Sequence, residues 1–274
     1  MPGGSATTTM QSLVHAITSP AAVGTEIPIP WPSLQRLVTL RTSEILVIGA
    51  APGGGKSTVA VALAIESGQH VLYLAQDGPA SIVARMLAYQ LNIPIHQAYD
   101  MMLDDRGQMS LSHRLGNITD HIIIERGAVT VEGITERVEA ATEWIGHPPP
   151  IVVVDNLIDL KVEGSNHAEM GFYSRALTDL KQLANSLDIL VVALHHVTRG
   201  GDDDHGLGQS PITLKDLLFA GEREARHVWG VYNNGRNRIT IQVLKQTDGS
   251  ANPHGTLRTS LEWKQETGRI WSSG

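Results

Sequence analysis

From Glu44 onward, short apolar runs alternate with stretches of helical spacing. We expect buried strands at 45–48, 70–75, 121–125, 151–155 and 189–194, and helices at 57–66, 81–91, 130–144 and 169–185. Apolar strands that are each followed by a helix predict a parallel sheet covered on both faces. After Gly221 the character changes. Segments 228–232, 238–244 and 257–264 alternate apolar and polar residues between turn residues, which predicts an antiparallel extension of this sheet.

Composition limits the domain organisation and the location. A chain of 274 residues with 42% hydrophobic content can bury one large core. We expect a flexible arm over residues 1–24 and one domain over residues 25–274. The chain has no cysteine, which excludes disulfides, thiol catalysis and cysteine-ligated metal. With no membrane-length apolar run and no signal-peptide pattern, we expect a cytoplasmic protein that does not contact a membrane.

The charge balance bears on possible partners. The formal net charge of −7 gives no general attraction for nucleic acid. Any DNA-binding surface must therefore be local.

The most informative segment reads ILVIGAAPGGGKST from position 45 to position 58. It predicts a strand, a glycine-rich turn and a helix that starts near Lys56, which is the context of a phosphate-binding loop. The turn glycines let successive backbone N–H groups point at an anion, and the helix N-terminus faces the same point. Ala50 stands where the pattern usually has its first glycine, and alanine is small enough for that position. The expected phosphate-binding residues are Ala51, Pro52, Gly53, Gly54, Gly55, Lys56, Ser57 and Thr58.

The chemistry of such a loop assigns roles to two of its side chains. Lys56 would reach the β- and γ-phosphates of a nucleoside triphosphate, and the Ser57 hydroxyl would hold Mg²⁺. A second element, IVVVD at 151–155, predicts a buried strand that delivers a carboxylate at its C-terminal edge. That edge is where Mg²⁺ needs a further anchor, so Asp155 is the expected magnesium residue. The sequence thus predicts ATP and Mg²⁺ as ligands.

A third element, LVVALHHVTRGG at 190–201, is an apolar strand that ends in polar groups. His195 and His196 are adjacent on this strand and must point to opposite faces, so only one of them can face the nucleotide. One structural and one solvated histidine is the alternative. Metal binding by these histidines with His205 and Asp202–Asp204 is disfavoured because the strand separates the first pair.

The order of these elements resembles the ATPase domain of DnaB-type replicative helicases, a RecA-like group of P-loop NTPases. The similarity extends over about residues 25–271. Its local matches are IPWPSL at 29–34, the segment 70–80 followed by RMLA at 85–88, the Asp155 strand, the 191–199 strand and KQTDG at 245–249.

The resemblance implies roles for several further residues. Asp77 would activate the attacking water, and His196, at the position of the family's usual glutamine, would relay the state of the γ-phosphate. Lys245 would complete the ATP site of a neighbouring subunit. Arg199, Lys215 and Lys161 would lie on loops that face single-stranded DNA.

The sequence departs from the family pattern at several positions. Asp77 stands where the helicases usually have glutamate, and capping of the helix near Pro79 is its alternative role. Thr247 stands where an arginine finger is usual, so Lys245 alone, or Arg236 or Arg238, would supply the charge. Asp202–Asp204 lie in the loop over residues 199–216, which is expected to face DNA, and like charge there opposes binding. We expect no counterpart of the family's N-terminal primase-binding domain.

We therefore expect an α/β fold: a RecA-like, mostly parallel twisted sheet with helices on both faces and a C-terminal antiparallel extension. The expected function is that of a DNA helicase of phage or plasmid replication. It would hydrolyse ATP as a homo-oligomeric ring, expected to be a hexamer, on single-stranded DNA, with a primase or loader as a possible partner. A RecA-like regulatory or recombination-mediator ATPase without unwinding activity is the alternative. A nucleotide-dependent scaffold with negligible turnover is a third possibility.

Overall fold

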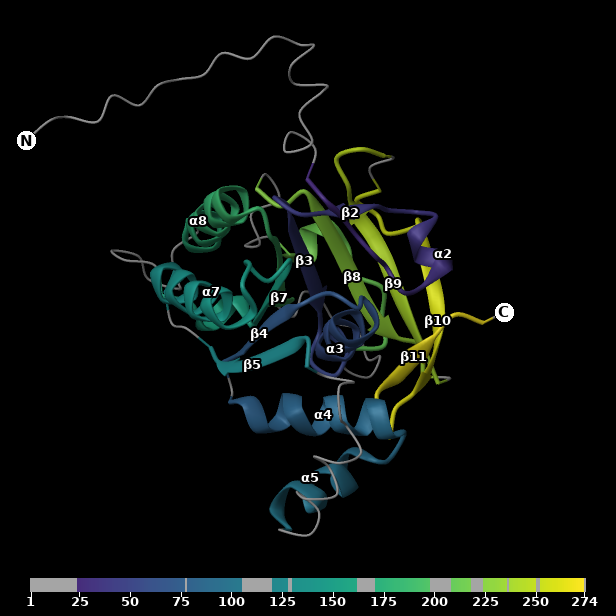
Figure 1. Cartoon of the computed structure of the whole chain (residues 1–274). Coiled ribbons are helices and arrows are strands. Elements are labelled where there is room, and N and C mark those ends of the chain that lie inside the picture. Colours follow the sequence, from purple (N-terminus) through teal and green to yellow (C-terminus); the bar gives the residue numbers. More distant parts are fainter. Residues whose placement is uncertain are drawn as a thin grey trace, which may run out of the picture.

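A twisted nine-stranded sheet forms the centre of the protein (Figure 1). The computed structural model describes residues 24–76, 78–104, 120–127, 130–161, 171–197, 208–217, 224–235, 237–249 and 252–273. The sheet order is β11-β10-β9-β8-β3-β7-β6-β4-β5, and a separate two-stranded sheet pairs β1 with β2. The strands from β8 to β5 in this order run parallel, and β9, β10 and β11 are antiparallel.

The strands are β1 (Glu26–Ile27), β2 (Leu40–Arg41), β3 (Ile45–Ala50), β4 (Val71–Ala75), β5 (Ile122–Arg126), β6 (Ile151–Asp155), β7 (Leu190–His196), β8 (His227–Asn233), β9 (Arg238–Lys245), β10 (Arg258–Lys264) and β11 (Arg269–Trp271). The α-helices are α2 (Pro32–Gln35), α3 (Lys56–Glu66), α4 (Pro79–Leu91), α5 (Ile95–Leu103), α7 (Val131–Ile145) and α8 (Phe172–Leu187). Two short 3₁₀ helices are η3 (Leu157–Asp159) and η4 (Leu214–Leu217).

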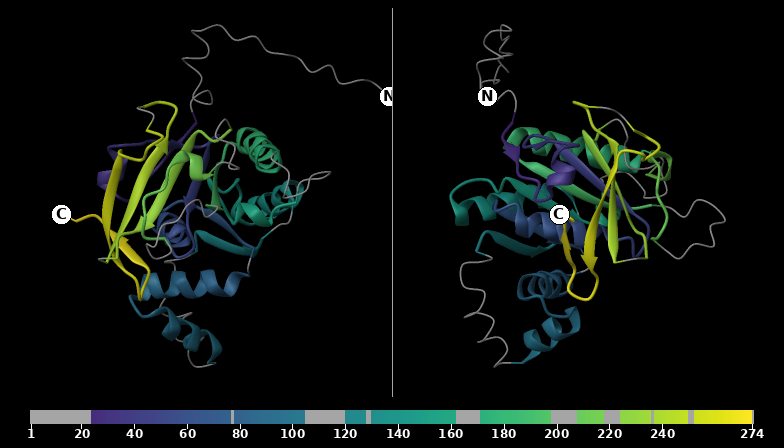
Figure 2. Two further views of the ribbon diagram at one scale, coloured as in Figure 1. Left: turned by 180° about the vertical axis from the view of Figure 1, so that it is seen from behind. Right: turned by 90° about the vertical axis from the view of Figure 1, so that its right-hand side faces the viewer.

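Helices cover both faces of the sheet. One face packs against α3 and α4, and the opposite face packs against α7 and α8 (Figures 1 and 2). In α3 every residue from Thr58 to Ile65 is buried, because this helix crosses the middle of the sheet. The central strands are apolar on both sides for the same reason. α5 packs on α4 away from the sheet.

The expected strands and helices are confirmed, with ends shifted by a few residues, and so is the fold class. One part of the expectation was wrong: β8 runs parallel to β3, so the antiparallel extension begins only at β9. β8 is buried along nearly its whole length beside the central strand, as a parallel strand must be. The expected arm over residues 1–24 lies outside the described residues except for Gly24. Among the described helices, none combines the length and the apolar content that a membrane crossing requires.

The topology brings three strand ends to one edge of the sheet. β3, β6 and β7 are parallel, and β3 and β6 each pair with β7. Ala50, Asp155 and His196 end these strands. In an open parallel sheet, ligands bind at this carboxyl edge. The sequence-predicted nucleotide residues therefore converge there.

Candidate nucleotide site

The loop between β3 and α3 has the backbone of an anion-binding turn. Gly53 and Gly55 adopt positive φ angles of 76° and 100°, and the Gly54 N–H donates to the Ala51 carbonyl at 2.9 Å. A methyl group on Gly54 would lie 3.0 Å from the Ala50 side chain and 3.1 Å from the Val231 carbonyl oxygen. A side chain at position 54 would therefore crowd its neighbours, so this position requires glycine. The Ala50 side chain fits beside the loop because residue 54 has no side chain.

Asp155 projects from the face of the sheet that packs against α3, the helix that begins at Lys56. Positions 151 and 153 of β6 belong to the core on the α3 side, and Asp155 continues that alternation. Lys56, Ser57 and Asp155 line one cavity of about 120 Å³, together with Ala75, Gly78, Ser81, Ile82 and Arg85. The fold thus brings together the three side chains expected to hold a phosphate and a magnesium ion.

Tyr73 orients the Asp155 carboxylate. The Tyr73 hydroxyl, on the neighbouring strand β4, donates to Asp155 Oδ2 at 2.8 Å. Tyr73 is fully buried, and burial, followed by the Asp155 charge, raises the pKa of its phenol well above the ordinary value. The phenol therefore stays protonated and donates at every physiological pH. One carboxylate oxygen is held in this way, and the carboxylate as a whole faces the cavity.

Sequence reasoning did not single out Tyr73 and Arg85 for this site. Arg85 comes from α4 and lines the same cavity as Lys56 and Asp155. A guanidinium at a phosphate site is a fixed positive charge with several donors. The sequence did place Arg85 on the helix that follows β4, near the expected site. Whether its side chain points into the site, however, depends on how α4 packs against the sheet.

The two histidines at the end of β7 point to opposite faces, as expected. His196 continues the α3-side alternation of 190, 192 and 194, whereas His195 lies on the α8 side with its ring 4.9 Å from that of Tyr173. His195 is 3% exposed. Burial, followed by the charges of His196 and Lys56, lowers the pKa of His195 to about 4. His195 is therefore a neutral structural residue, and His196 is the histidine on the nucleotide side.

One residue of the expected DNA-facing loop (199–216) contacts the phosphate loop directly. At Gly208, where φ is +81°, an added methyl would lie 2.5 Å from the Gly54 nitrogen. The Gly208 carbonyl accepts from the Asn233 N–H at 2.9 Å, and the Asn233 side chain donates to the Gly53 carbonyl at 3.3 Å. The backbone at Gly208 and the phosphate loop are therefore in direct contact and are bridged by Asn233. Arg199 and most of the loop between β7 and Gly208 lie outside the described residues, as do Asp77 and Arg236.

Comparison with known proteins identifies the family of this chain. A family model described as the DnaB-like helicase C terminal domain matches residues 31–249. The chain belongs to this helicase family. Two relatives, both named Gene 65 protein, come from Mycobacterium phages L5 and D29. The L5 protein is 23% identical over 258 residues, which cover 91% of this chain and 94% of the relative. The D29 protein is 22% identical over 236 residues, covering 82% and 98%.

Solved structures agree in fold. One of them, described as an ATPase domain, superimposes with a TM-score of 0.73 at 20% identity, over 93% of this chain and 94% of that one. A DnaB-like replicative helicase, described with its interactions with primase, gives 0.72 at 20% identity, over 90% of this chain and 62% of that one. Family membership makes this chain an ATP-dependent helicase domain, and it favours the helicase over the regulatory ATPase.

In this DnaB-like helicase the segment with Lys245 lies far from the chain's own phosphate loop. Lys245 pairs with Val228, near the start of β8, and its Nζ donates to the Ala225 carbonyl at 2.6 Å. That is the end of the sheet where β3 begins, whereas the phosphate loop follows the other end of β3. Val228 in turn pairs with Val47, three residues before the end of β3, and β9 lies two strands from β3. Lys245 is therefore about 10 Å from the end of β3 along the strands and about 10 Å across them. Its ammonium is held at Ala225, on the side away from its own subunit's phosphate loop.

An ion-pair network fixes this segment. Arg226 binds both carboxylate oxygens of Asp248, at 2.8 and 2.6 Å, and its Nε lies 2.9 Å from Glu44 Oε1. Glu44 is 6% exposed and also contacts His227 Nε2 at 2.9 Å. The hydrogen bond from Arg226 lowers the pKa of Asp248. This network ties residues 245–248 to the end of the sheet where β3 begins.

Proposed function

We propose that this helicase works as a hexameric ring of identical subunits that moves along single-stranded DNA and is driven by ATP hydrolysis at sites shared between neighbours. The observation that carries this proposal is the position of Lys245. Its ammonium is held at the Ala225 carbonyl, on the side away from its own phosphate loop, which favours its use at the ATP site of another copy of the chain. Head-to-tail contacts of this kind close into rings or run on into filaments. Membership of the DnaB-like helicase family favours the ring.

Within one site, each group has a separate task. The amides of Gly53–Gly55 and Lys56 bind the phosphates, where positioning and electrostatic stabilisation account for most of phosphoryl-transfer catalysis. Mg²⁺ fits beside Ser57 and Asp155, whose oxygens line one cavity, and when bound it would neutralise charge on the phosphates. Asp77 would orient the attacking water. His196 would sense the γ-phosphate, and Lys245 of the next subunit would stabilise the developing charge.

The coupling of ATP to DNA would pass through the loop after β7. His196 stands at its start, and Gly208, within the loop, packs on the phosphate loop. Arg199 lies between these two residues in the sequence, and its DNA contact would depend on the phosphate state that they sense. Lys215 and Lys161 are exposed on the segments that follow β7 and β6, and they would add positive charge near the same DNA strand.

The setting of this motor is phage replication in the cytoplasm of a host cell. The relatives are phage proteins, and one structural neighbour is a replicative helicase that interacts with primase. We propose a primase or a loader as the partner of this ring.

A subunit-mixing experiment tests the shared site. Lys56→Ala should abolish hydrolysis, and Lys245→Ala should reduce it strongly while nucleotide still binds. Mixing the two inactive proteins should restore part of the single-stranded-DNA-stimulated ATPase, since some interfaces then join an intact Lys56 to an intact Lys245. A matched control, Lys181→Ala, removes an exposed lysine of α8 and should retain full activity.

Three results would count against the proposal. A fully active monomer by light scattering contradicts shared sites, as does the absence of any activity recovery on mixing. ATPase that no length of single-stranded DNA stimulates favours the regulatory ATPase, and binding of ATP with negligible turnover favours the scaffold.

A further inference from the structure

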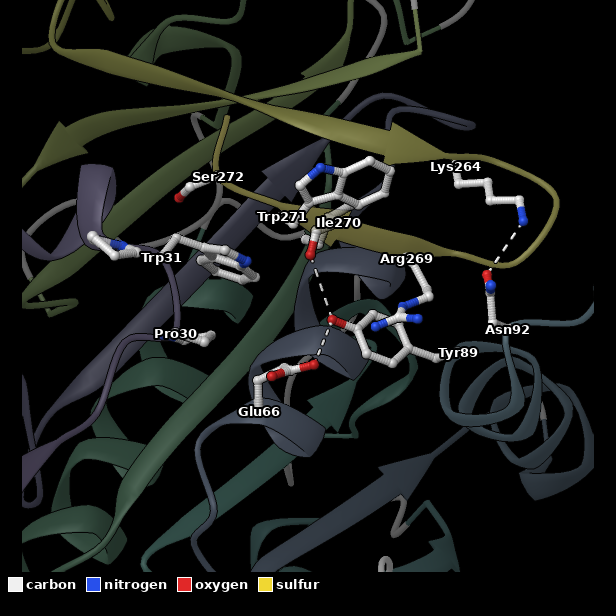
Figure 3. A pocket seen from close by; sticks show the side chains of 11 residues that line it. Pro30, Trp31, Glu66, Tyr89, Asn92, Lys264, Arg269, Ile270, Trp271 and Ser272 are labelled. Atoms are coloured by element: carbon white, nitrogen blue, oxygen red, sulfur yellow. Dashed lines mark hydrogen bonds between the residues drawn. The ribbon is translucent and has the colours of Figure 1, made fainter. Parts of the chain in front are cut away.

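A cavity larger than the phosphate site lies at the edge of the sheet. This pocket of about 510 Å³ lies where the β10–β11 hairpin meets the C-terminal ends of α3 and α4 (Figure 3). Lys56 and Glu66 mark the two ends of α3, which are about 16 Å apart. Glu66 lines this pocket and Lys56 lines the phosphate site. The two cavities are therefore separate, and the proposed motor function leaves the larger one unused.

Aromatic rings form much of the pocket wall. Trp31 and Tyr89 are buried below it, at 2% and 3% exposure, while Trp271 on β11 is 47% exposed. Exposure of half a tryptophan on a short edge strand leaves an indole face open to a ligand (Figure 3). Indole faces are good stacking surfaces for flat rings, including every nucleobase.

Charged groups surround the open indole face. Lys264 and Arg269 are opposite each other in the β10–β11 ladder, and Trp271 lies two residues beyond Arg269, so these side chains project from the same face of the hairpin. The Arg269 guanidinium lies over the Tyr89 ring, 5.7 Å from its centroid (Figure 3). Lys264 Nζ donates to Asn92 Oδ1 at 3.2 Å, which uses one of its three donors. Two cations thus stand beside the stacking platform.

One carboxylate balances these cations on the floor of the pocket. Glu66 Oε1 accepts from the Tyr89 hydroxyl at 3.0 Å. Burial, followed by the Glu66 charge, raises the pKa of Tyr89 well above its ordinary value, so the phenol remains the donor in this bond. Glu66 keeps its second oxygen as an acceptor for a ligand N–H group.

We propose that this pocket binds one nucleotide unit, with the base on Trp271, an exocyclic amino group at Glu66 and the phosphate at Lys264 and Arg269. A nucleotide combines a flat ring, a donor and an anion, and the three parts match the three kinds of group on the wall. The volume lies within the range of small-ligand pockets. The nucleotide is either free or part of a single strand, since both carry the same base and phosphate chemistry.

The experiment uses wild-type protein whose phosphate loop is saturated with inorganic pyrophosphate and Mg²⁺, because this blocking ligand has no base and leaves the stacking surface of the proposed pocket free. Equilibrium dialysis with labelled dAMP, and separately with a six-residue oligo(dA), then counts additional binding. Binding of dAMP at one extra site per subunit identifies free nucleotide as the ligand, and binding of the oligonucleotide alone identifies the strand. In either case dTMP or oligo(dT) should bind more weakly, because thymine has no exocyclic amino group.

Variants connect this binding to the pocket. Trp271→Ala should weaken it about tenfold or more, and Trp271→Phe, which keeps a stacking ring, should recover most of the affinity. Trp144→Ala is the matched control, because Trp144 is 71% exposed on α7 and lines a different hollow. Far-ultraviolet circular dichroism checks that each variant is folded.

The proposal is overturned if neither probe binds to the pyrophosphate-saturated protein, or if Trp271→Ala and Trp144→Ala affect binding equally. It is also overturned if an acidic proline-rich peptide, and no nucleotide, binds in a Trp271-dependent way, because proline-rich segments dock on aromatic-lined grooves and the two cations would attract acidic residues.

Discussion

His195 should make the stability of this helicase domain fall as the pH is lowered. Its pKa is about 4 in the folded protein, against 6.5 for an ordinary histidine. Between these two values the unfolded chain binds a proton that the folded protein does not, so the free energy of unfolding decreases as the pH falls through this window. The full effect, below pH 4, is about 3 kcal/mol. Above pH 6.5 His195 is neutral in both the folded and the unfolded chain, so it no longer reduces the free energy of unfolding.

The measurable part lies between pH 7 and pH 5. Over that interval the two pKa values give a loss of about 2 kcal/mol from this one side chain. The assay is urea unfolding at both pH values, for the wild-type protein and for His195→Phe. Phenylalanine keeps the edge-on ring contact with Tyr173 and cannot titrate. Any packing cost of the substitution is the same at both pH values and cancels in the difference. The other histidines are common to both proteins and cancel as well.

The variant should therefore lose about 2 kcal/mol less stability than the wild-type protein between pH 7 and pH 5. A second measurement locates the cause. The Lys56 charge contributes to the low pKa of His195, so Lys56→Met should raise that pKa, as followed by NMR titration of the ring. Equal pH dependence of wild type and His195→Phe would refute the reasoning, because it would mean that His195 is protonated in the folded protein.

Three further predictions concern the nucleotide site. Tyr73→Phe removes the hydrogen bond to Asp155. This variant should lower the magnesium-dependent ATPase rate by on the order of tenfold and raise the magnesium concentration needed for half-maximal activity. An unchanged magnesium titration would show that Tyr73 does not position the carboxylate. Arg85→Met keeps an apolar side chain in the cavity but removes the charge. The Kd for a nucleoside triphosphate should rise by about tenfold or more, whereas the Kd for a nucleoside should not change. An equal loss of affinity for both ligands would contradict a phosphate-binding role. Gly208→Ala should weaken triphosphate binding, because the methyl would meet the Gly54 backbone, which cannot give way as a flexible side chain can. Gly146→Ala, at φ +85° with no neighbour within 4 Å, carries the same backbone strain without that clash, and similar nucleotide affinity in both variants would exclude the contact as the cause.

The sequence alone determined much of the phosphate site. Lys56, Ser57 and the glycines are consecutive, so their geometry is set by one turn and one helix start, both of which are local. The alternation along 151–155 and 190–196 also fixed which of two neighbouring side chains share a face, and this correctly separated His195 from His196. Asp155 followed from its place at the end of an apolar strand. In each case the information lies within about fifteen residues.

Tertiary structure alone decided which distant segments meet. Arg85 enters the phosphate site only because α4 packs across the sheet, and Tyr73 reaches Asp155 only because β4 pairs with β6. β8 has the same alternation whether it runs parallel or antiparallel, so its direction depended on the neighbouring β3. The contact of Gly208 with Gly54 and the distance of Lys245 from its own phosphate loop are likewise properties of packing. Local patterns fix the conformation and the face of a residue, but its neighbours across the fold are set by burial of the whole sheet between two helical layers.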